Sequence, residues 1–289
     1  MKMLLTGERG KLVTRFCKYI QENRDDIDVQ LMSVRGDEWR DADFAMYDVV
    51  VHCAGLINCE EDSYEEYERV NVRLTRDIFT KCVEQKVPYF IYLSSMAVYD
   101  GTEWGFGEQG IITAQTKPFP KSYYGKSKYV AEQAIESVPN NGTTVAIVRA
   151  PSIVGGAMED YFGKYIRFSR LPFLPIPKIH LEAKRSFVYV ETLIEFICYL
   201  AENVKAGIFF PQNYPSLSVS EMYEEVCKAQ GKKRLAVRLA SGILPSKIEK
   251  QLFRQICYEE ELSKEENEAV GRISAREAIH LVVEELVKR

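Results

Sequence analysis

MLLTGERGKLV, at residues 3–13, joins an apolar run of strand length directly to a turn that contains two glycines. Gly7 and Gly10 allow the backbone to turn tightly and to approach a pyrophosphate at the start of the following helix. Lys11 and Leu12 are expected to begin that helix. Because two glycines at this spacing also occur in plain turns, the stretch predicts a dinucleotide site only if a suitable sheet surrounds it.

The first half of the chain continues this pattern, with apolar runs alternating with segments of helical periodicity. The candidate strands cover residues 2–6, 28–34, 47–53, 88–94 and 143–149, and the candidate helices cover residues 11–23, 64–84 and 121–138. Each helix is long enough to make the crossover that parallel strands require. The pattern predicts an α/β fold with a Rossmann-type, doubly wound parallel sheet.

The second half of the chain has a different residue pattern. It contains a proline-rich segment at 171–177 that cannot form a regular helix or a central strand. Further elements are expected as helices near 158–169, 191–204, 219–230 and 274–287 and as strands near 187–190 and 207–210. We therefore predict a dinucleotide-binding domain over residues 1–152, with 186–212 returning to it. A smaller C-terminal substrate-binding region is expected over 153–185 and 213–289.

The bulk composition excludes several classes of protein. The net charge is -4 and no basic stripe is present, so no nucleic-acid partner is expected. No apolar run is long enough for a membrane span and no leader-like start is visible, which predicts a cytoplasmic protein. The seven cysteines lack paired spacing and read as free thiols of a reducing compartment. His52, His180 and His280 have no neighbouring ligand at metal-binding spacing, so no metal is expected.

The residues that follow the second and third strands bear on the cofactor. No acidic residue ends the second strand to take the two hydroxyls of an adenosine ribose, whereas Ser33 and Arg35 are present. A guanidinium suits a 2′-phosphate, which favours NADP over NAD. The alternative is that Arg35 is a solvated loop charge. Cys53 ends the third strand and is followed by Ala54 and Gly55, whose small size would let a dinucleotide pass close over the backbone.

Tyr124 and Lys128 suggest a catalytic pair. They are four residues apart in the expected helix 121–138, so both project from one face. A phenol becomes a usable base near neutral pH when a fixed ammonium and an oxidised nicotinamide stabilise the phenolate. An isolated match of this kind more often marks an exposed amphipathic helix. Here Ser95 ends the fourth strand and supplies a second polar group at a plausible place.

Taken together, these pieces resemble the extended short-chain dehydrogenase/reductase family, which comprises NAD(P)-dependent nucleotide-sugar epimerases, dehydratases and reductases. The resemblance spans roughly residues 1–230. It is carried by Thr6-Gly7-Glu8-Arg9-Gly10, Asp48 to Gly55, Asn71-Val72 with Thr75, Val87-Pro88-Tyr89-Phe90 leading to Ser94-Ser95, Ser122 to Lys128 with Ala131-Glu132-Gln133, Val148 to Gly155, and Arg185 to Val190. The order and spacing of these pieces make chance agreement unconvincing.

The resemblance implies roles for individual residues. Tyr124 would exchange a proton with a sugar hydroxyl during hydride transfer, Lys128 would lower the pKa of Tyr124 and hold the nicotinamide ribose, and Ser95 would hydrogen-bond the reacting oxygen. Arg185 would hold the nucleotide diphosphate, unless it pairs with a carboxylate such as Glu182 or Glu191. The remaining implied contacts are Asn71, Ala150 and Pro151 with the cofactor and Met96 with the substrate.

The reaction can be narrowed in part. By resemblance, dehydratases carry an Asp-Glu pair directly after the Ser95 position, whereas Met96 and Ala97 stand here, which disfavours dehydration. A C4 epimerase that keeps its cofactor and a reductase of 4-keto sugars both remain. A non-catalytic redox sensor is the third reading. Val13, which replaces the third glycine of the usual fingerprint, is compatible with such a sensor. The presence of Ser95, Tyr124 and Lys128 together argues against it. The family also implies a homodimer through helices 64–84 and 121–138 and a role in polysaccharide biosynthesis.

Overall fold

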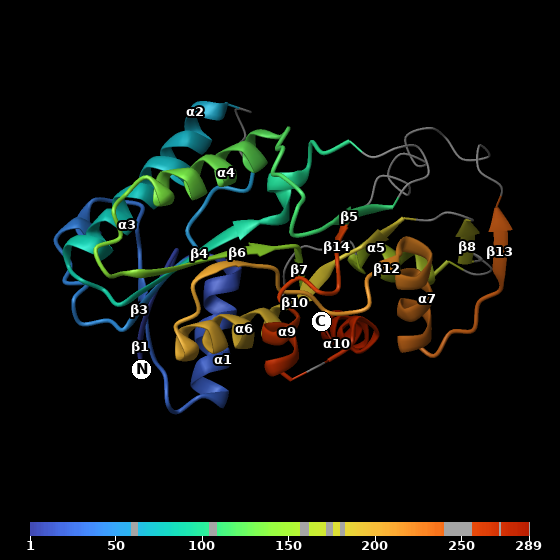
Figure 1. Cartoon of the computed structure of the whole chain (residues 1–289). Helices are drawn as coiled ribbons and strands as arrows, with labels where there is room; N and C mark the ends of the chain where they lie inside the picture. The colour runs from blue at the N-terminus through green and yellow to red at the C-terminus, as the bar shows by residue number, and fades with distance from the viewer. Residues whose placement is uncertain are drawn as a thin grey trace. The chain divides into compact units, whose positions relative to one another are not determined.

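A computed structural model describes residues 1–58, 63–103, 109–156, 162–171, 176–179, 183–239, 256–271 and 273–288. The chain divides into two compact units (Figure 1). Unit 1 contains residues 1–102, 117–151 and 194–211, and unit 2 contains residues 103–116, 152–193 and 212–289. Among the described residues, every helix is too short or too polar to span a lipid bilayer.

Unit 1 is built on a six-stranded parallel sheet in the order β11-β6-β4-β3-β1-β2. The strands are β1 (Lys2–Thr6), β2 (Asp28–Met32), β3 (Val49–His52), β4 (Tyr89–Ser95), β6 (Thr144–Ala150) and β11 (Gly207–Phe209). The central strands are buried on both faces, which is why their sequences are nearly continuous apolar runs. The predicted doubly wound sheet is confirmed.

Helices cover both faces of this sheet, as Figure 1 shows. One face carries α1 (Lys11–Asn23) and α6 (Val190–Asn203), and the other carries α2 (Tyr64–Tyr67), α3 (Leu74–Glu84) and α4 (Tyr123–Glu136). Two short 3-10 turns, η1 (Glu38–Arg40) and η3 (Met96–Tyr99), follow strands β2 and β4. The predicted helix 64–84 is interrupted by a π-helical turn, η2 (Glu68–Arg73), a rare feature that often accompanies functional sites.

Unit 2 consists of four two-stranded sheets and four described helices. The strand pairs are β7 (Ser152–Val154) with β10 (Phe187–Tyr189), β9 (Lys184–Arg185) with β12 (Leu217–Ser218), β8 (Ile176–Ile179) with β13 (Ala236–Leu239), and β5 (Gly110–Ile112) with β14 (Ile256–Tyr258). The helices are α5 (Phe162–Ser169), α7 (Val219–Ala229), α9 (Lys264–Ala269) and α10 (Ala275–Val287). Capping boxes begin both α7 and α10, which explains where these helices start.

The return of residues 186–212 to the main sheet is only partly observed. Strand β11 does pair with β6, but β10 pairs with β7 in unit 2. The interruption is local, because Pro151 lacks an N–H and ends β6, and the chain resumes as β7 with a different neighbour. Residues 103–116 also belong to unit 2. The substrate-binding role of this unit stays a prediction, and residues 158–161 of the expected helix lie outside the described part of the chain.

Candidate functional site

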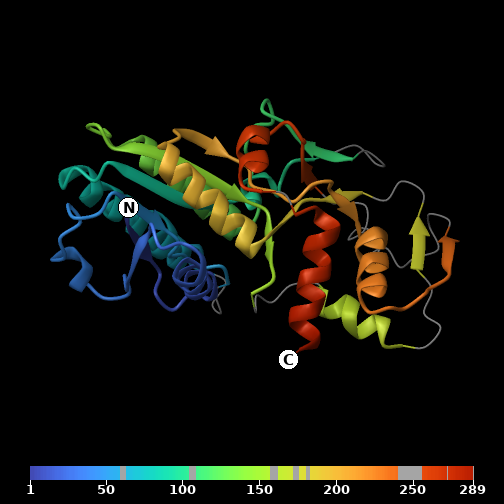
Figure 2. The same cartoon turned by 90° about the horizontal axis from the view of Figure 1, so that it is seen from below.

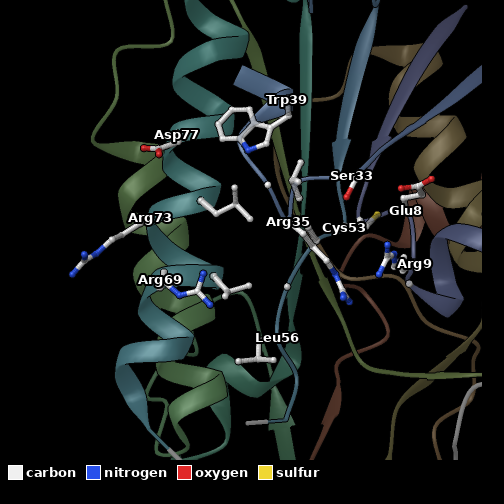
Figure 3. A pocket seen from close by; sticks show the side chains of 18 of the residues that line it. Glu8, Arg9, Ser33, Arg35, Trp39, Cys53, Leu56, Arg69, Arg73 and Asp77 are labelled. Atoms are coloured by element: carbon white, nitrogen blue, oxygen red, sulfur yellow. The ribbon is translucent and has the colours of Figure 1, made fainter. Parts of the chain in front are cut away.

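A cavity of about 740 Å³ lies in unit 1, where the carboxyl ends of β1, β2 and β3 meet (Figure 3). Its position follows from the sheet order, because these three strands are neighbours and parallel. Ligands of open α/β sheets bind at this edge. Of the residues that the sequence assigns to a cofactor, Gly7, Gly10, Ser33, Arg35, Cys53, Ala54 and Gly55 line the cavity.

The floor of the cavity depends on Gly7. Its φ of +96° lies in the left-handed region, and a Cβ atom there would stand 3.1 Å from the backbone N and Cα of Ala54. The Gly10 N–H donates to the Gly7 carbonyl at 2.8 Å, which closes the turn. Any side chain at Gly7 would therefore both strain the backbone and push the loop after β3. Val13 is buried, and its Cγ2 would stand 3.8 Å from a Cβ at Gly10.

The wall of the cavity carries five arginines, and three of them are neutralised by acidic partners. Arg40 pairs with Asp37 at 3.0 Å and with Asp77 at 2.9 Å. The other two pairs are Arg69 with Glu66 at 2.7 Å and Arg73 with Glu68 at 3.1 Å. These guanidinium groups are already matched, so they add little net field to the cavity.

Arg9 and Arg35 are the other two arginines of the cavity wall. Neither forms an ion pair or a hydrogen bond with any residue that the structure describes. Both side chains extend toward the same end of the cavity in Figure 3, with Ser33 at the end of the second strand nearby. Two uncompensated guanidinium groups beside one hydroxyl form a donor set that suits a phosphate group.

Ser95 and Tyr124 meet at the edge of the same sheet. Ser95 ends β4, and the start of α4 is set by Ser122, whose hydroxyl accepts a hydrogen bond from the Gly125 N–H at 3.0 Å. The Ser95 side chain lies close enough to the Tyr124 phenol to influence its pKa. Burial raises the pKa of Tyr124, and the neighbouring Ser95 hydroxyl acts against this increase.

Lys128 is buried beneath the cavity. Its ammonium donates to the Leu93 carbonyl at 2.8 Å and lies 4.8 Å from the centre of the Tyr92 ring. A Cβ at Gly55 would stand 3.3 Å from its Nζ, so Lys128 reaches the cavity wall. Burial lowers the pKa of Lys128 to about 8, and the negative charge of Glu132 opposes this effect.

The lowering of the Tyr124 pKa by Lys128 stays a prediction. No charge among the described residues lowers the pKa of the Tyr124 phenol, which burial holds above its usual range. The Leu93 carbonyl and the Tyr92 ring stabilise the Lys128 ammonium. A usable phenolate at neutral pH thus requires a further positive charge beside the phenol.

Asn71 lies in the π-helical turn and is fully buried. Its Oδ1 accepts from the Leu56 N–H at 2.6 Å, and its Nδ2 donates to the Leu56 carbonyl and to the Ser127 hydroxyl, both at 2.9 Å. Ser127 in turn donates to the Tyr124 carbonyl at 2.8 Å. Because its amide bonds to these partners, Asn71 positions the cavity wall and α4, and its contact with the cofactor stays a prediction.

His52 extends this network toward the glycine turn. Thr75 donates its hydroxyl proton to the Asn71 carbonyl at 2.7 Å, so it can only accept from His52 Nε2, 3.0 Å away. His52 Nδ1, 2.7 Å from the Thr6 hydroxyl, is then the acceptor. Burial and the charge of Lys128 lower the pKa of His52 to about 3, so the ring stays neutral. Across the described residues, no cluster of potential metal ligands is present.

A buried ion pair joins α4 to the central sheet. Arg149 on β6 pairs with Glu132 on α4 at 2.7 Å, and both side chains are almost fully buried. The Ser94 hydroxyl donates to Glu132, and Arg149 donates to the Tyr99 hydroxyl. The pair ties α4 to β4, to β6 and to the η3 turn that follows Ser95.

The remaining predicted residues are more dispersed. Lys11 and Leu12 begin α1 but do not line the cavity, and neither do Ala150 and Pro151. Ala150 pairs with Ser95 in the sheet register, and Met96 is buried directly after Ser95. Arg185 belongs to unit 2 on β9. Sequence reasoning missed Arg9, Arg69 and Arg73, of which only Arg9, inside the glycine turn, carried a usable signal.

The pKa of Lys128 predicts a stability effect. An unfolded lysine titrates near 10.5 but the folded one near 8, so folding must bury a charge below pH 8, and this cost disappears as the pH rises toward 10.5. We expect Lys128→Met to raise the free energy of unfolding at pH 7 by about 1–3 kcal/mol, less whatever the lost hydrogen bond to Leu93 contributes.

Urea denaturation at pH 7 and pH 10 measures this effect, with Lys126→Met on the exposed face of α4 as the control. The gain should shrink at pH 10. A Lys128→Met protein that is less stable at pH 7, or equally stabilised at both pH values, would contradict the assignment.

Comparison with known proteins shows which family and fold this chain resembles. The model of the NAD dependent epimerase/dehydratase family matches residues 4–209. The chain is 28% identical over 215 residues to N-acetyl-alpha-D-glucosaminyl-diphospho-ditrans,octacis-undecaprenol 4-epimerase of Escherichia coli O157:H7. That match covers 71% of this chain, and the chain spans 61% of the length of this curated relative.

Solved structures share the fold of the whole chain. UDP-glucuronic acid 4-epimerase from Bacillus cereus, in complex with NAD, has a TM-score of 0.70 at 18% identity, covering 100% of this chain and 99% of that one. dTDP-4-dehydrorhamnose reductase from Bacillus anthracis, in complex with NADP, has a TM-score of 0.73 at 16% identity, with the same coverage. The two neighbours carry out different reactions on one fold, so the fold does not choose between them.

Proposed function

Because this chain belongs to the NAD dependent epimerase/dehydratase family, we propose that it is an NAD(P)-dependent enzyme that oxidises and reduces C4 of a sugar carried on a diphosphate. The observation that carries the proposal is the placement of Ser95 beside Tyr124 at the edge of a sheet whose neighbouring strands border the 740 Å³ cavity. The cavity fits a dinucleotide, because Gly7 leaves room for close approach and two arginines are uncompensated.

The residues of unit 1 have separable roles in this proposal. The nicotinamide, when bound, supplies hydride transfer and, in its oxidised form, a positive charge. Tyr124 Oη holds or accepts the proton of the sugar hydroxyl, and Ser95 hydrogen-bonds the phenol and the reacting oxygen. Lys128, held on the Leu93 carbonyl, lies where it can orient the ribose beside Gly55. Asn71 and Ser127 fix the position of the Tyr124 backbone.

The glycine turn provides a test of the cofactor site. We expect Gly7→Ala to weaken dinucleotide binding at least about tenfold, because the left-handed φ and the contact with Ala54 together cost roughly 1–3 kcal/mol. Gly142→Ala is the matched control, since Gly142 has a similar φ of +99° but no atom within 4 Å of its Cβ position. Both variants should lose some stability in thermal denaturation, but only Gly7→Ala should lose affinity in calorimetric titration. Equal affinities would refute the placement.

NADP is favoured over NAD by the unpaired Arg9 and Arg35. We expect Arg35→Ala to weaken NADP(H) binding by about tenfold or more while changing NAD(H) binding little, because only the former carries a 2′-phosphate. Arg73→Ala is the control, since Arg73 lines the same cavity but pairs with Glu68. Fluorescence titration with both cofactors measures the ratio, and equal losses for both would overturn the preference.

A 4-epimerase is the first candidate within this class, because the curated relative at 28% identity is named as one. The diphosphate of the substrate would be bound by Arg185 in unit 2, and the sugar carrier is either a nucleotide or a lipid, as in that relative's name. Incubation of the purified protein with UDP-N-acetylglucosamine and with its lipid-diphosphate counterpart, followed by separation of the C4 epimers, tests the proposal. No interconversion in either case would refute it.

A 4-keto reductase is the second candidate, and the absence of an acidic residue at the end of β2 favours it, since NADP would then exchange as a substrate. Mass analysis of the purified protein separates the two: retained dinucleotide supports the epimerase, and net NADPH consumption with a 4-keto sugar supports the reductase. Binding of dinucleotide without turnover of any sugar would favour the sensor reading. We further propose a cytoplasmic homodimer that pairs through α3 and α4, which the mass in solution would test.

A further inference from the structure

The exposed side of α5 in unit 2 combines cations with apolar side chains. Phe162, Ile166 and Ser169 are buried, whereas Lys164, Arg167 and Phe168 face the solvent. These spacings of three and four residues divide a helix into an inner and an outer face. Phe168 is 51% exposed although Phe is among the residues most often buried.

A second segment extends this outer face, the one that follows α7. Lys232 and Arg234 donate to the Ser169 carbonyl at 3.0 and 2.7 Å, and Arg234 also donates to the Leu171 carbonyl at 2.9 Å. The end of α5 and the segment between α7 and β13 therefore lie side by side, as the ribbons in Figure 2 also show. Leu171 is 51% exposed and Leu235 is 77% exposed. The α5 surface is defined as Lys164, Arg167, Phe168, Arg170, Leu171, Lys233 and Leu235.

The charge of this surface is opposite to that of the chain. Residues 162–171 and 230–235 contain six Lys or Arg and no acidic residue, although the whole chain carries a net charge of -4. Within the described residues, Lys164, Arg167, Arg170 and Lys233 take part in no ion pair. The surface thus offers uncompensated cations interleaved with three exposed apolar side chains.

We propose that the α5 surface docks on the anionic face of a lipid membrane. Phe168, Leu171 and Leu235 would enter the interface between headgroups and acyl chains, and the long cationic side chains would reach the lipid phosphates. A second copy of the chain is a poor occupant, because it would place the same cations against each other. The contact is peripheral, since α5 has only 8 residues and cannot cross a bilayer.

Membrane docking bears on whether the sugar substrate is carried on a lipid or on a nucleotide. A sugar diphosphate carried on a lipid exists only at the bilayer, so a docked enzyme would meet it there by diffusion in two dimensions. The docking itself does not depend on the proposed reaction. Vesicle binding is measured without turnover, so failure of the docking proposal and failure of the proposed function give different results.

The test is co-flotation of the purified full chain with vesicles of phosphatidylglycerol and phosphatidylcholine, compared with vesicles of phosphatidylcholine alone. We expect binding to the anionic vesicles that falls as salt is raised, because exposed charges are screened. Arg167→Gln, Arg170→Gln and Lys233→Gln together should weaken it at least tenfold, since each surface cation contributes roughly fivefold in binding. Phe168→Ser, Leu171→Ser and Leu235→Ser together should weaken it similarly.

The matched control removes three exposed apolar side chains elsewhere, Met46, Ile208 and Val287, each replaced by Ser. It should bind vesicles like the wild type. The two α5-surface variants should retain their circular dichroism spectra and their turnover of a water-soluble nucleotide sugar. The proposal is overturned if the wild type ignores anionic vesicles, binds uncharged vesicles equally well, or loses no affinity in either variant. It is also overturned if the variants change only the oligomeric mass.

Discussion

Tyr124→Phe should reduce kcat by roughly 10²–10⁴-fold and leave the dissociation constant of the dinucleotide within about twofold of the wild type. This substitution removes only the phenol hydroxyl group. It lies near Ser95 at the sheet edge, and Tyr124 does not line the cavity proposed for the dinucleotide. Phenylalanine fills the same half-buried space, so the fold should be unaffected. Proton transfer at the sugar hydroxyl would then have no acid or base.

Steady-state kinetics together with calorimetric titration of the cofactor separate the two effects. Tyr123→Phe is the matched control, because Tyr123 precedes Tyr124 on the same helix but is 41% exposed. It should retain wild-type kcat. Full activity in the Tyr124→Phe enzyme would eliminate the proposed mechanism, and a parallel loss of cofactor affinity would show that the phenol supports binding instead of chemistry.

Glu132→Leu should lower the free energy of unfolding by about 3–5 kcal/mol, because it leaves the buried Arg149 guanidinium without its carboxylate. The Ser94 hydroxyl loses its acceptor in the same variant. Neither group can recover water as a partner, since Arg149 and Ser94 are 5% and 3% exposed. This ion pair joins α4 to the centre of the sheet.

The double variant Glu132→Leu with Arg149→Met should recover most of the loss, since removing both charges also removes the cost of an unpaired one. Glu136→Leu, one turn further along α4 and exposed, should change stability by less than about 0.5 kcal/mol. Urea denaturation of the four proteins measures these differences. A Glu132→Leu protein as stable as the wild type, or a double variant less stable than Glu132→Leu alone, would contradict this account of the pair.

The sequence predicted features that depend on consecutive residues, and it did not predict features that depend on contacts between distant residues. The expected strand 2–6 and helix 11–23 agree with β1 and α1, because periodicity and the glycine turn are written in consecutive residues. The π-helical turn within 64–84 left no such pattern, because it is maintained by contacts of Asn71 with Leu56 and Ser127. The placement of β10 beside β7 likewise depends on a partner that lies elsewhere in the chain.

The sequence by itself determined the parallel sheet, the sheet edge at which a ligand is expected, and the placement of Tyr124 and Lys128 four residues apart in α4. These features follow from spacing along the chain. Tertiary structure alone decided that Arg9 and Arg35 have no described ion-pair partner, that Asn71 is committed to protein partners, and that the Lys128 ammonium lies on the Leu93 carbonyl. The physical reason is that a side chain's charge state and hydrogen bonds depend on which distant groups exclude water from it.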